Sequence, residues 1–356
     1  PEPMTPMPGQ PIRILYAATY YADRYVRQTM VLRALRAQPN CDVSVLQVNS
    51  PHWWRYLVFF WRWLRTDKRQ FDVIILGWRA HEVIPLLRWL TKKPLVVDMF
   101  LSVSETLIEE RRSVPAWSVP GRLSIWLDHT AVRAASAIFC DTEADRQFMI
   151  QRFGAKPEAS FVVYVGADAS LFPAASESRQ PSREVTVLFY GTFLPLHGVR
   201  TIVAAANLLR TEPHIRFVLL GDGRAKATAQ SAADSKAQIT WLGRVRQEEL
   251  AGTVRQADIV LGGPFADLPK AKRVITTKTY QALQMGKAVI VGDTPANREL
   301  LQSDQNCLMV PLNNPEALAA AIRRLAADQS LRIALGAGAK QLAGSIDRQL
   351  IAQVGK

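Results

Sequence analysis

The chain of 356 residues contains little cysteine and no long apolar run. Its three cysteines, Cys41, Cys140 and Cys307, are odd in number and far apart. They argue against a disulfide framework or a cysteine-based metal site and favour buried thiols in a reducing cytosol. No stretch approaches the roughly 18 to 20 apolar residues of a membrane span, and the Pro-rich start lacks the apolar core of a signal peptide. We therefore expect a cytoplasmic protein, in solution or bound peripherally to the inner face of the cell membrane.

The sequence also lacks the motifs of nucleic-acid-binding and metal-dependent proteins. No segment resembles a helix-turn-helix, an aromatic RNA-binding strand or a zinc finger, and no Asp-x-Asp triplet is present. Acidic residues are the minority, since the chain has 44 Lys and Arg but only 31 Asp and Glu, which gives a net charge of +13. Such an excess implies an anionic partner. We expect a phosphate-bearing substrate and an anionic membrane surface, with no nucleic acid, no metal site and no cofactor.

Short runs of Val, Ile and Leu alternate with amphipathic segments through the whole chain. Chains of this length usually form two domains, and strand–helix alternation predicts doubly wound parallel sheets. In the first half, the expected strands cover 12–18, 42–48, 72–77, 94–100, 136–141 and 160–166. After a Ser/Pro-rich interval the pattern restarts, with strands at 185–191, 215–221, 238–243, 258–263, 287–292 and 306–311.

Amphipathic segments between these strands are expected to be helices. In the first half they cover 25–37, 79–91, 104–112, 120–134 and 143–153. In the second half they cover 198–210, 224–236, 247–256, 276–285, 295–302 and 315–327, and the Ala/Leu-rich tail at 331–355 is also helical. The predicted division is a Rossmann-like domain at 11–172, a linker at 173–184, a second Rossmann-like domain at 185–340 and a C-terminal helix at 341–356.

A glycine-containing turn follows the first strand of the second half, and such turns before a helix can hold phosphate. In YGTFLPLHG, Gly191 and Thr192 end the strand, and His197 precedes Gly198, which opens a helix. His197 suits a phosphate, either as a hydrogen-bond donor when neutral or as a cation when protonated. Alternatively, it caps the helix or packs between domains.

Later turns of the second half extend this edge. GDGR brings Gly221 and Gly223 towards a ligand, although the pattern is not GxGxxG after a first strand, so NAD is not favoured. In WLGRV, Arg244 and Val245 follow the third strand, and Arg244 either meets the donor or is an ordinary solvated arginine. GDTPANREL adds the carboxylates Asp293 and Glu299, of which Glu299 could meet sugar hydroxyls, and Asn297, which could cap a helix; ordinary capping is the equally favoured alternative for the segment.

KAKRVITTKTYQALQMGKAV (270–289) carries the strongest signal. Lys278 stands at a helix start, where its charge and the helix dipole both favour a diphosphate, although a solvated helix lysine is the ordinary alternative. Gln281 offers a neutral carbonyl oxygen as a hydrogen-bond acceptor. The polar neighbours of these two residues are Lys270, Arg273, Thr276 and Thr277.

The order and spacing of these segments resemble the nucleotide-sugar half of the retaining glycosyltransferases of family 4, most strongly from 185 to 327. That family usually has Glu-x7-Glu where this chain has Arg273 and Gln281, and Lys or Arg where it has His197. A subset of the family instead carries a Lys-rich loop followed by Pro-Asn-Lys and Tyr-Glu-Ala. This chain resembles that subset through Lys270, Arg273, Thr276, Thr277, Lys278 and Gln281.

The resemblance implies an α/β fold of the GT-B type: two Rossmann-like domains facing each other across a cleft, with the last helix returning to the first domain. It implies retaining, metal-independent transfer of a sugar from a nucleoside-diphosphate sugar to a lipid-linked, polysaccharide or small-molecule acceptor. Cations and helix dipoles would stabilise the leaving diphosphate, and the donor phosphate would help to deprotonate the acceptor. The implied donor site contains Gly191, Thr192, His197, Gly221, Gly223, Arg244, Val245, Arg273, Thr277, Lys278 and Gln281.

Acceptor-side candidates lie in the N-terminal half. The loop after the first strand, ATYYADRYVRQ (18–28), would line the cleft with Tyr20, Arg24 or Arg27. DMFLSVSETLIEERR (98–112) resembles an acceptor-side segment of the same subset, and its Asp98 joins His197 and Lys278 as a catalytic candidate. The remaining candidates, for which capping is the ordinary alternative, are Ser102, Glu105 and Thr106.

SPHWWRYLVFFWRWLRTDKRQF (50–71) interleaves aromatic residues with arginine. Trp favours the membrane interface and Arg meets anionic headgroups, so this segment predicts membrane contact. The alternative is a buried helix of the N-terminal domain. The predicted membrane residues are Trp53, Trp54, Trp61 and Trp63.

Two other functions fit the sequence. The missing carboxylates are compatible with a non-catalytic sugar-nucleotide-binding subunit, and a sugar-nucleotide epimerase would use the same fold. The retained Lys278 and the glycine turns favour the transferase. The donor base, the sugar, the acceptor and the oligomeric state do not follow from the sequence.

Overall fold

The structure is a computed structural model that describes residues 10–20, 25–50, 52–77, 79–111, 113–174 and 184–355. The chain divides into two compact units. The first consists of Pro1–Val165 and Arg348–Lys356, and the second of Gly166–Asp347. The change of unit thus falls at residues 165 and 166, whereas the sequence placed the end of the first domain at 172. Most of the predicted linker lies outside the described residues.

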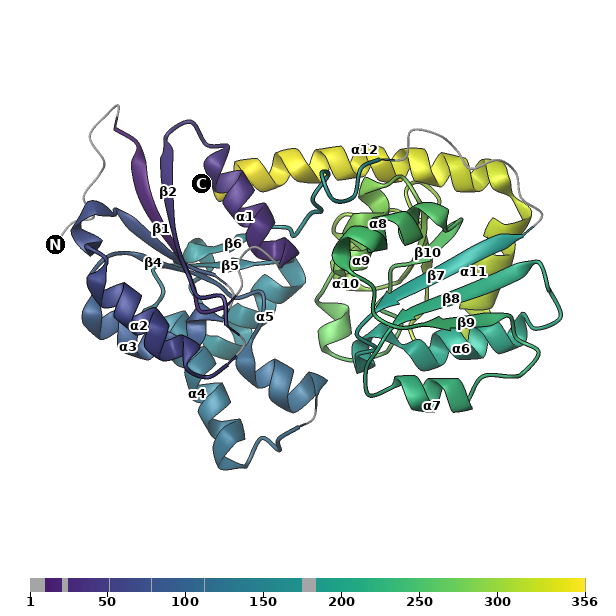
Figure 1. Ribbon diagram of the computed structural model, residues 1–356, viewed down its shortest axis with the longest axis horizontal. Helices are drawn as coiled ribbons and strands as arrows, with labels where there is room; N and C mark the ends of the chain where they lie inside the picture. Colours follow the sequence, from purple (N-terminus) through teal and green to yellow (C-terminus); the bar gives the residue numbers. More distant parts are fainter. Residues whose placement is uncertain are drawn as a thin grey trace. The chain divides into compact units, whose positions relative to one another are not determined.

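The first unit is built on a six-stranded parallel sheet with the order β2-β1-β3-β4-β5-β6 (Figure 1). Its strands are β1 (Ile12–Ala18), β2 (Cys41–Gln47), β3 (Val73–Leu76), β4 (Leu95–Asp98), β5 (Ala137–Cys140) and β6 (Ser160–Val162). Its helices are α1 (Val26–Arg36), α2 (Arg55–Arg65), α3 (Ile84–Leu90), α4 (Val119–Ala134) and α5 (Glu143–Phe153). Shorter turns are η2 (Lys68–Gln70), η3 (Ala80–Val83), the π-helix η4 (Glu105–Glu110) and η5 (Pro157–Ala159).

Both faces of this sheet are buried, which explains its nearly continuous apolar strands. Along β1, Leu15 and Ala17 join one core with α2, α3 and α5, while Ile14 and Tyr16 join another core with α1. The end of the last helix, α12 (Gln329–Val354), packs into that second core. The side chain of Gln38 also donates to the carbonyl of Ile351 at 2.6 Å. Residues 348–355 therefore complete the first unit.

The second unit has its own six-stranded parallel sheet, with the order β12-β11-β10-β7-β8-β9. Its strands are β7 (Val185–Gly191), β8 (Ile215–Gly221), β9 (Ile239–Leu242), β10 (Ile259–Leu261), β11 (Ala288–Gly292) and β12 (Leu308–Val310). Its helices, besides the first part of α12, are α6 (Val199–Leu208), α7 (Lys226–Ser231), α8 (Gln247–Gln256), α9 (Thr277–Gln284), α10 (Pro295–Arg298) and α11 (Pro315–Ala327). Each strand predicted from the sequence overlaps an observed one.

The strand order of each sheet reverses at one point, and ligands of such sheets bind at the carboxyl ends of the strands beside that point. In the first unit the chain leaves β1 for β2 on one side and returns to β3 on the other. In the second unit it leaves β7 for β8 and β9 and returns to β10. The loops after β1 and β3, and those after β7 and β10, are therefore where each unit should carry its site.

Membrane-spanning helices and metal-ligand clusters are both absent from the described residues. No helix there is both long enough and apolar enough to cross a bilayer. No group of three or more His, Cys, Asp or Glu side chains in the same residues could hold a metal ion.

Candidate functional site

Tightly packed glycine turns form the floor of the site in the second unit. Gly221 has a φ of 128°, and a Cβ there would lie 1.9 Å from the carbonyl oxygen of Gly191. A Cβ on Gly223 would lie 2.1 Å from the carbonyl oxygen of Thr192. Because real Cβ atoms cannot approach so closely, the turns after β7 and β8 can touch only where side chains are absent. The structure thus brings the predicted Gly191, Thr192, Gly221 and Gly223 together.

Lys278 reaches this floor from the second position of α9. Its side chain is buried, and its Nζ lies 5.4 Å from the centre of the Phe189 ring. A Cβ on Gly191 would be 3.6 Å from this Nζ. Burial lowers the pKa of Lys278 from 10.5 to about 7. Within the part of the chain that the structure describes, no carboxylate lies within salt-bridge distance of Nζ, so the buried amine has no anionic partner there.

His197 lies beside the same glycine. It ends the short turn η6 (Pro195–His197) and is buried edge-on against Phe189, with ring centres 5.7 Å apart. A Cβ on Gly191 would be 3.3 Å from its Cε1. Burial, and then the charge of Lys278, lower the pKa of His197 well below its usual value. The imidazole is therefore neutral at neutral pH, which leaves hydrogen bonding as its mode of contact. Its Nδ1 has no hydrogen-bond partner among the described residues.

Gln281 is more constrained than the sequence suggested. Its Oε1 accepts a hydrogen bond of 2.9 Å from the hydroxyl of Tyr190, and both side chains are buried. One acceptor position of the amide oxygen is therefore occupied, although a carbonyl oxygen can accept two hydrogen bonds. Tyr190 was not identified from the sequence, because as the sixth residue of an apolar strand it has the pattern of a core aromatic.

The rest of the predicted donor set is less buried. Thr277 opens α9 and is half-buried, as are Arg273 and Val245, while Arg244 is exposed. The sequence analysis missed Lys226, whose Nζ donates to the carbonyls of Gly221 at 2.9 Å and of Leu242 at 3.2 Å. Lys226 ties the turns after β8 and β9 together. Its Asp222-x-x-x-Lys226 spacing, which places the two side chains one helical turn apart, was the available signal.

The segment after β11 has structural tasks. The amide of Asn297 donates to the carbonyl of Gly292 at 2.7 Å and to that of Gly263 at 3.3 Å. Thr294, rather than Asn297, caps α10. Asp293 forms an ion pair with Arg298, and Glu299 is half-buried. The capping and packing interpretation of this segment is thus the better supported one.

The first unit carries a pocket of about 330 Å³ at the carboxyl ends of β1, β3 and β4, beside its reversal of strand order. The predicted Tyr20, Ser102 and Thr106 line it, whereas Arg24 lies outside the described residues. Further lining residues that the sequence did not single out are Tyr25, Arg79, Glu82, Leu101, Val103, Leu107 and Arg111.

A charged cluster fixes one wall of this pocket. Arg79 Nε donates to Glu82 Oε1 at 2.7 Å, and Arg55 lies 3.7 Å from the same carboxylate. The hydroxyl of Tyr56 also donates to Glu82. Arg79 has a φ of 59°, and the Thr19 hydroxyl donates to its carbonyl at 3.0 Å. Such a backbone conformation is uncommon for a residue with a side chain and persists where the surroundings hold it. The wall is therefore preformed.

The surroundings of Asp98 argue against the predicted catalytic role. Both of its carboxylate oxygens accept hydrogen bonds from the buried Arg27, at 3.0 to 3.2 Å. Arg27 also donates to the carbonyl of Val163. An ion pair that is buried on both sides holds elements together, because neither charge is available to a substrate. The geometry thus favours a structural pair of Asp98 with Arg27, which the sequence placed near substrate, and the catalytic role of Asp98 stays a prediction.

Ser102 and Glu105 belong to a second buried network. The carboxylate of Asp128 accepts from the hydroxyls of Ser102 at 2.6 Å and Ser104 at 2.5 Å. It also accepts from the backbone amides of residues 103 and 104. Glu105 is buried, and its backbone amide donates to the Ser102 hydroxyl. The predicted acceptor contacts of these two residues are thus replaced mainly by support of the loop after β4, although Ser102 still borders the pocket.

The aromatic segment at 50–71 divides between core and surface. Trp63 is 0% exposed and packs on Phe59 in the core of the first unit, so the prediction that it contacts a membrane is wrong. Trp53, Trp54 and Trp61 are exposed, at 70%, 45% and 53%. The tryptophans differ in exposure because α2 is apolar on two faces and packs only one of these faces on the sheet.

Comparison with known proteins shows what part of this chain resembles. Residues 184–328, which contain the glycine turns, His197 and Lys278, match the family described as glycosyl transferases group 1. Over this segment the chain is similar to the group 1 glycosyltransferases. A D-inositol 3-phosphate glycosyltransferase from Kineococcus radiotolerans is 29% identical over an alignment of 316 residues, gaps included, that covers 78% of this chain and 69% of that protein. A phosphatidyl-myo-inositol mannosyltransferase from Mycolicibacterium smegmatis is 27% identical over 158 residues, 43% of this chain and 39% of that protein.

The fold agrees with this relationship. The crystal structure of HepE from Anabaena in complex with UDP has a TM-score of 0.69 and 16% identity, covering 97% of this chain and 100% of HepE. At that identity the likeness concerns the fold, and it confirms the GT-B type, with two Rossmann-like units, that the sequence predicted. The matched segment lies within the second unit.

Proposed function

We propose that this glycosyltransferase relative moves a hexosyl group, with retention, from a nucleoside-diphosphate sugar, with UDP or GDP as the nucleotide, to a hydroxyl of a lipid-linked, polysaccharide or small-molecule acceptor. The observation that carries the proposal is Lys278, a buried amine without an anionic partner among the described residues. It faces Gly191 and His197 at the carboxyl end of β7, where the strand order reverses. A diphosphate would supply the missing negative charge at this point.

The residues of the second unit suggest how the bond to the sugar is broken. The bond between the anomeric carbon and the diphosphate oxygen breaks as charge develops on the diphosphate, which Lys278 stabilises. The neutral His197 donates a hydrogen bond to the departing group or to the sugar. The acceptor oxygen bonds the anomeric carbon on the face that the diphosphate leaves, and its proton passes to the diphosphate. Gln281, held by Tyr190, would offer its amide oxygen to a ribose hydroxyl, as the family resemblance implies.

The pocket of the first unit supplies our proposal for the acceptor. Tyr20, Tyr25 and Thr106 offer hydroxyls, and the Arg79–Glu82 pair offers charged hydrogen-bonding groups. This chemistry suits a sugar or a cyclitol, and the exposed Arg111 suits a phosphate carried by it. Two relatives carry the names D-inositol 3-phosphate glycosyltransferase and phosphatidyl-myo-inositol mannosyltransferase. These names support such an acceptor.

A donor screen tests the proposal directly. Purified protein is melted with UDP-, GDP- and dTDP-sugars, and the true donor should raise the melting temperature, since a ligand stabilises by RT ln(1 + [L]/Kd). The same donor should be hydrolysed slowly and turned over with a polyol acceptor, and EDTA in the assay should leave turnover intact.

Stabilisation without any hydrolysis or transfer would favour a non-catalytic binding subunit. Interconversion of the donor sugar without an acceptor would reveal an epimerase, and abolition by EDTA with rescue by manganese would refute metal independence.

Arg79→Ala should weaken acceptor use and leave donor use unchanged. We expect KM for the acceptor to rise roughly 10- to 100-fold, because a hydrogen bond to a charged group is worth about 1.5–3 kcal/mol. Steady-state kinetics with each substrate varied in turn measures the effect. The matched control is Arg13→Ala, which breaks an arginine–carboxylate pair with Asp72 near the other end of the same sheet. Equal effects of both variants, or a rise in donor KM with Arg79→Ala, would contradict the acceptor assignment.

A further inference from the structure

A second apolar surface lies on the outside of the first unit. On α2, the core stripe of Phe59 and Trp63 is opposed by an outer stripe at a spacing of three to four residues. A helix that is apolar on both sides is normally covered on both sides. The members of the outer stripe, which are 53% to 70% exposed, are Trp53, Leu57, Trp61 and Leu64.

The neighbouring helix α3 continues this surface. Leu86 is 52% exposed, Trp89 is 90% exposed and Leu90 is 41% exposed, again at helical spacing. The carboxyl-terminal ends of the two helices line a common pocket. We call the outer stripe of α2 together with Leu86, Trp89 and Leu90 the α2–α3 face. Contiguous apolar surfaces of this kind mark interaction sites in soluble proteins.

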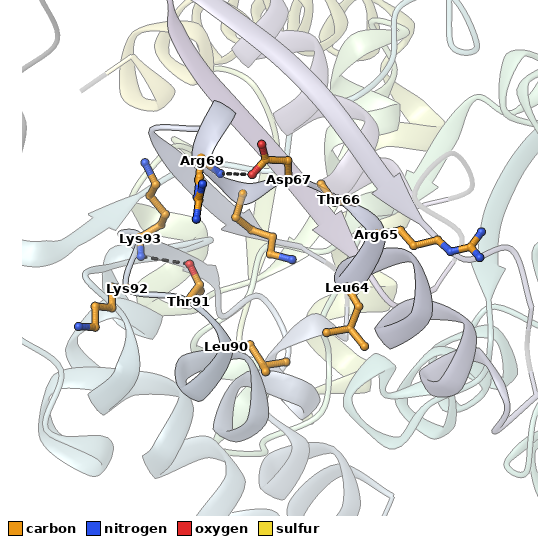
Figure 2. A pocket seen from close by; sticks show the side chains of 10 residues that line it. Leu64, Arg65, Thr66, Asp67, Arg69, Leu90, Thr91, Lys92 and Lys93 are labelled. Atoms are coloured by element: carbon orange, nitrogen blue, oxygen red, sulfur yellow. Dashed lines mark hydrogen bonds between the residues drawn. The ribbon is translucent and has the colours of Figure 1, made fainter.

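A basic pocket of about 610 Å³ adjoins the α2–α3 face. Figure 2 shows Leu64 from α2 and Leu90 from α3 at one side of it and the side chains of Arg69, Lys92 and Lys93 at another. The one acidic lining residue, Asp67, accepts a hydrogen bond of 3.0 Å from the backbone of Arg69. The five cations that line the pocket are Arg65, Lys68, Arg69, Lys92 and Lys93.

Ordinary helix chemistry accounts for only part of this charge. A cation in the last turn of a helix stabilises the helix dipole, and Arg65 of α2 and Arg88 of α3 stand in those positions. Lys68 donates to the carbonyl of Trp63 at 2.7 Å, which satisfies one helix end. Arg69, Lys92 and Lys93 lie beyond the helices and add positive charge that the helix ends do not require.

We propose that the α2–α3 face docks on an anionic phospholipid bilayer, with the indole rings of Trp61 and Trp89 in the interface and the basic pocket over the headgroup phosphates. Trp is the side chain that favours the interfacial layer, because its ring is apolar and its N–H is polar. The guanidinium of Arg65 lies 4.0 Å from the centre of the Trp61 ring, so a cation accompanies the ring to the surface. A protein partner or a second copy would need a complementary acidic patch, whereas an anionic bilayer presents negative charge everywhere.

Cosedimentation with vesicles tests the proposal. The intact protein is mixed with phosphatidylcholine vesicles with and without phosphatidylglycerol, at low and at physiological salt. We expect binding to the anionic vesicles only, weakening as salt screens the charges. Trp61→Gln/Trp89→Gln should abolish binding, while Trp117→Gln, which changes a Trp that is 82% exposed outside this face, should not affect it. Equal loss with both variants would overturn the assignment of the face.

A second pair of variants tests the pocket. Arg69→Gln/Lys92→Gln/Lys93→Gln should weaken binding on the order of 100-fold, because each cation near an anionic surface contributes about fivefold. The control Arg216→Gln/Arg323→Gln/Arg324→Gln removes the same charge from exposed positions of the second unit and should weaken binding far less.

Stability and assembly provide the deciding controls. All of these variants should keep the melting temperature of the parent, since the residues changed are exposed or, in the case of Lys93, half-buried. Equal loss with both triple variants would show that net charge, not the pocket, binds the vesicles. Sedimentation of the protein without vesicles tests self-association. If the parent is a dimer that does not bind vesicles, and Trp61→Gln/Trp89→Gln dissociates this dimer, the bilayer proposal is overturned in favour of self-association.

Discussion

Replacing Lys278 with methionine should lower kcat/KM by about 30- to 1,000-fold. This loss corresponds to a rise of roughly 2–4 kcal/mol in activation free energy. The loss is expected because no other described cation lies as close to Gly191 and His197 to stabilise the leaving diphosphate. The matched control is Lys272→Met, which changes a half-exposed lysine that pairs with Asp267 in the preceding turn. Near-normal activity of Lys278→Met, or an equal loss with Lys272→Met, would refute the assignment.

The same variant has a predictable effect on stability. Burial lowers the pKa of Lys278 from 10.5 to about 7, so between these values the unfolded chain binds more protons than the folded one. Stability of the parent should therefore rise with pH across this window, by about 2 kcal/mol between pH 7 and pH 9, while the destabilisation is fully present below pH 7. Lys278→Met lacks this group and should be more stable than the parent at pH 7. Denaturant unfolding of both proteins at the two pH values measures the difference.

Donor binding should be coupled to the same proton. A diphosphate beside Lys278 favours the ammonium form, so binding of UDP at pH 8 should take up a substantial fraction of a proton. Calorimetry in buffers with different enthalpies of ionisation measures this uptake, which should vanish in Lys278→Met. Unchanged proton uptake in that variant would place the diphosphate elsewhere.

Asp98→Ala should lower the free energy of unfolding by about 3–5 kcal/mol, because it leaves the buried Arg27 without its counter-charge. The double variant Arg27→Leu/Asp98→Leu should recover much of this loss, since two apolar side chains replace two buried charges. Chemical denaturation of the three proteins measures the effect. The control Asp72→Ala breaks an exposed pair with Arg13 and should change stability little.

This series separates the structural role of Asp98 from a catalytic one. A structural pair predicts that the refolded double variant retains activity in proportion to its folded fraction. A catalytic carboxylate predicts that activity stays lost even where stability returns. A stable but inactive double variant would therefore restore Asp98 to the catalytic set.

Local sequence patterns determined most of the framework of this protein. The apolar runs predicted the strands of both sheets, because a strand buried on both faces must be apolar throughout, whatever its neighbours are. The glycines after β7 and β8 and the lysine at the start of α9 were also readable, since a turn between a strand and a helix has strong local requirements. The resemblance carried by these segments agrees with the matched family.

Only the tertiary structure shows which residues that are distant in the sequence contact each other. Asp98 meets Arg27 across 71 residues because β4 and α1 come together in the folded unit, and no local pattern encodes that meeting. The same holds for Tyr190 and Gln281, which are 91 residues apart. The sequence showed that the segment at 50–71 is rich in tryptophan, but α2 is apolar on two sides. Packing on the sheet placed Trp63 inside and left Trp61 outside, because only one side of a helix can face a given core.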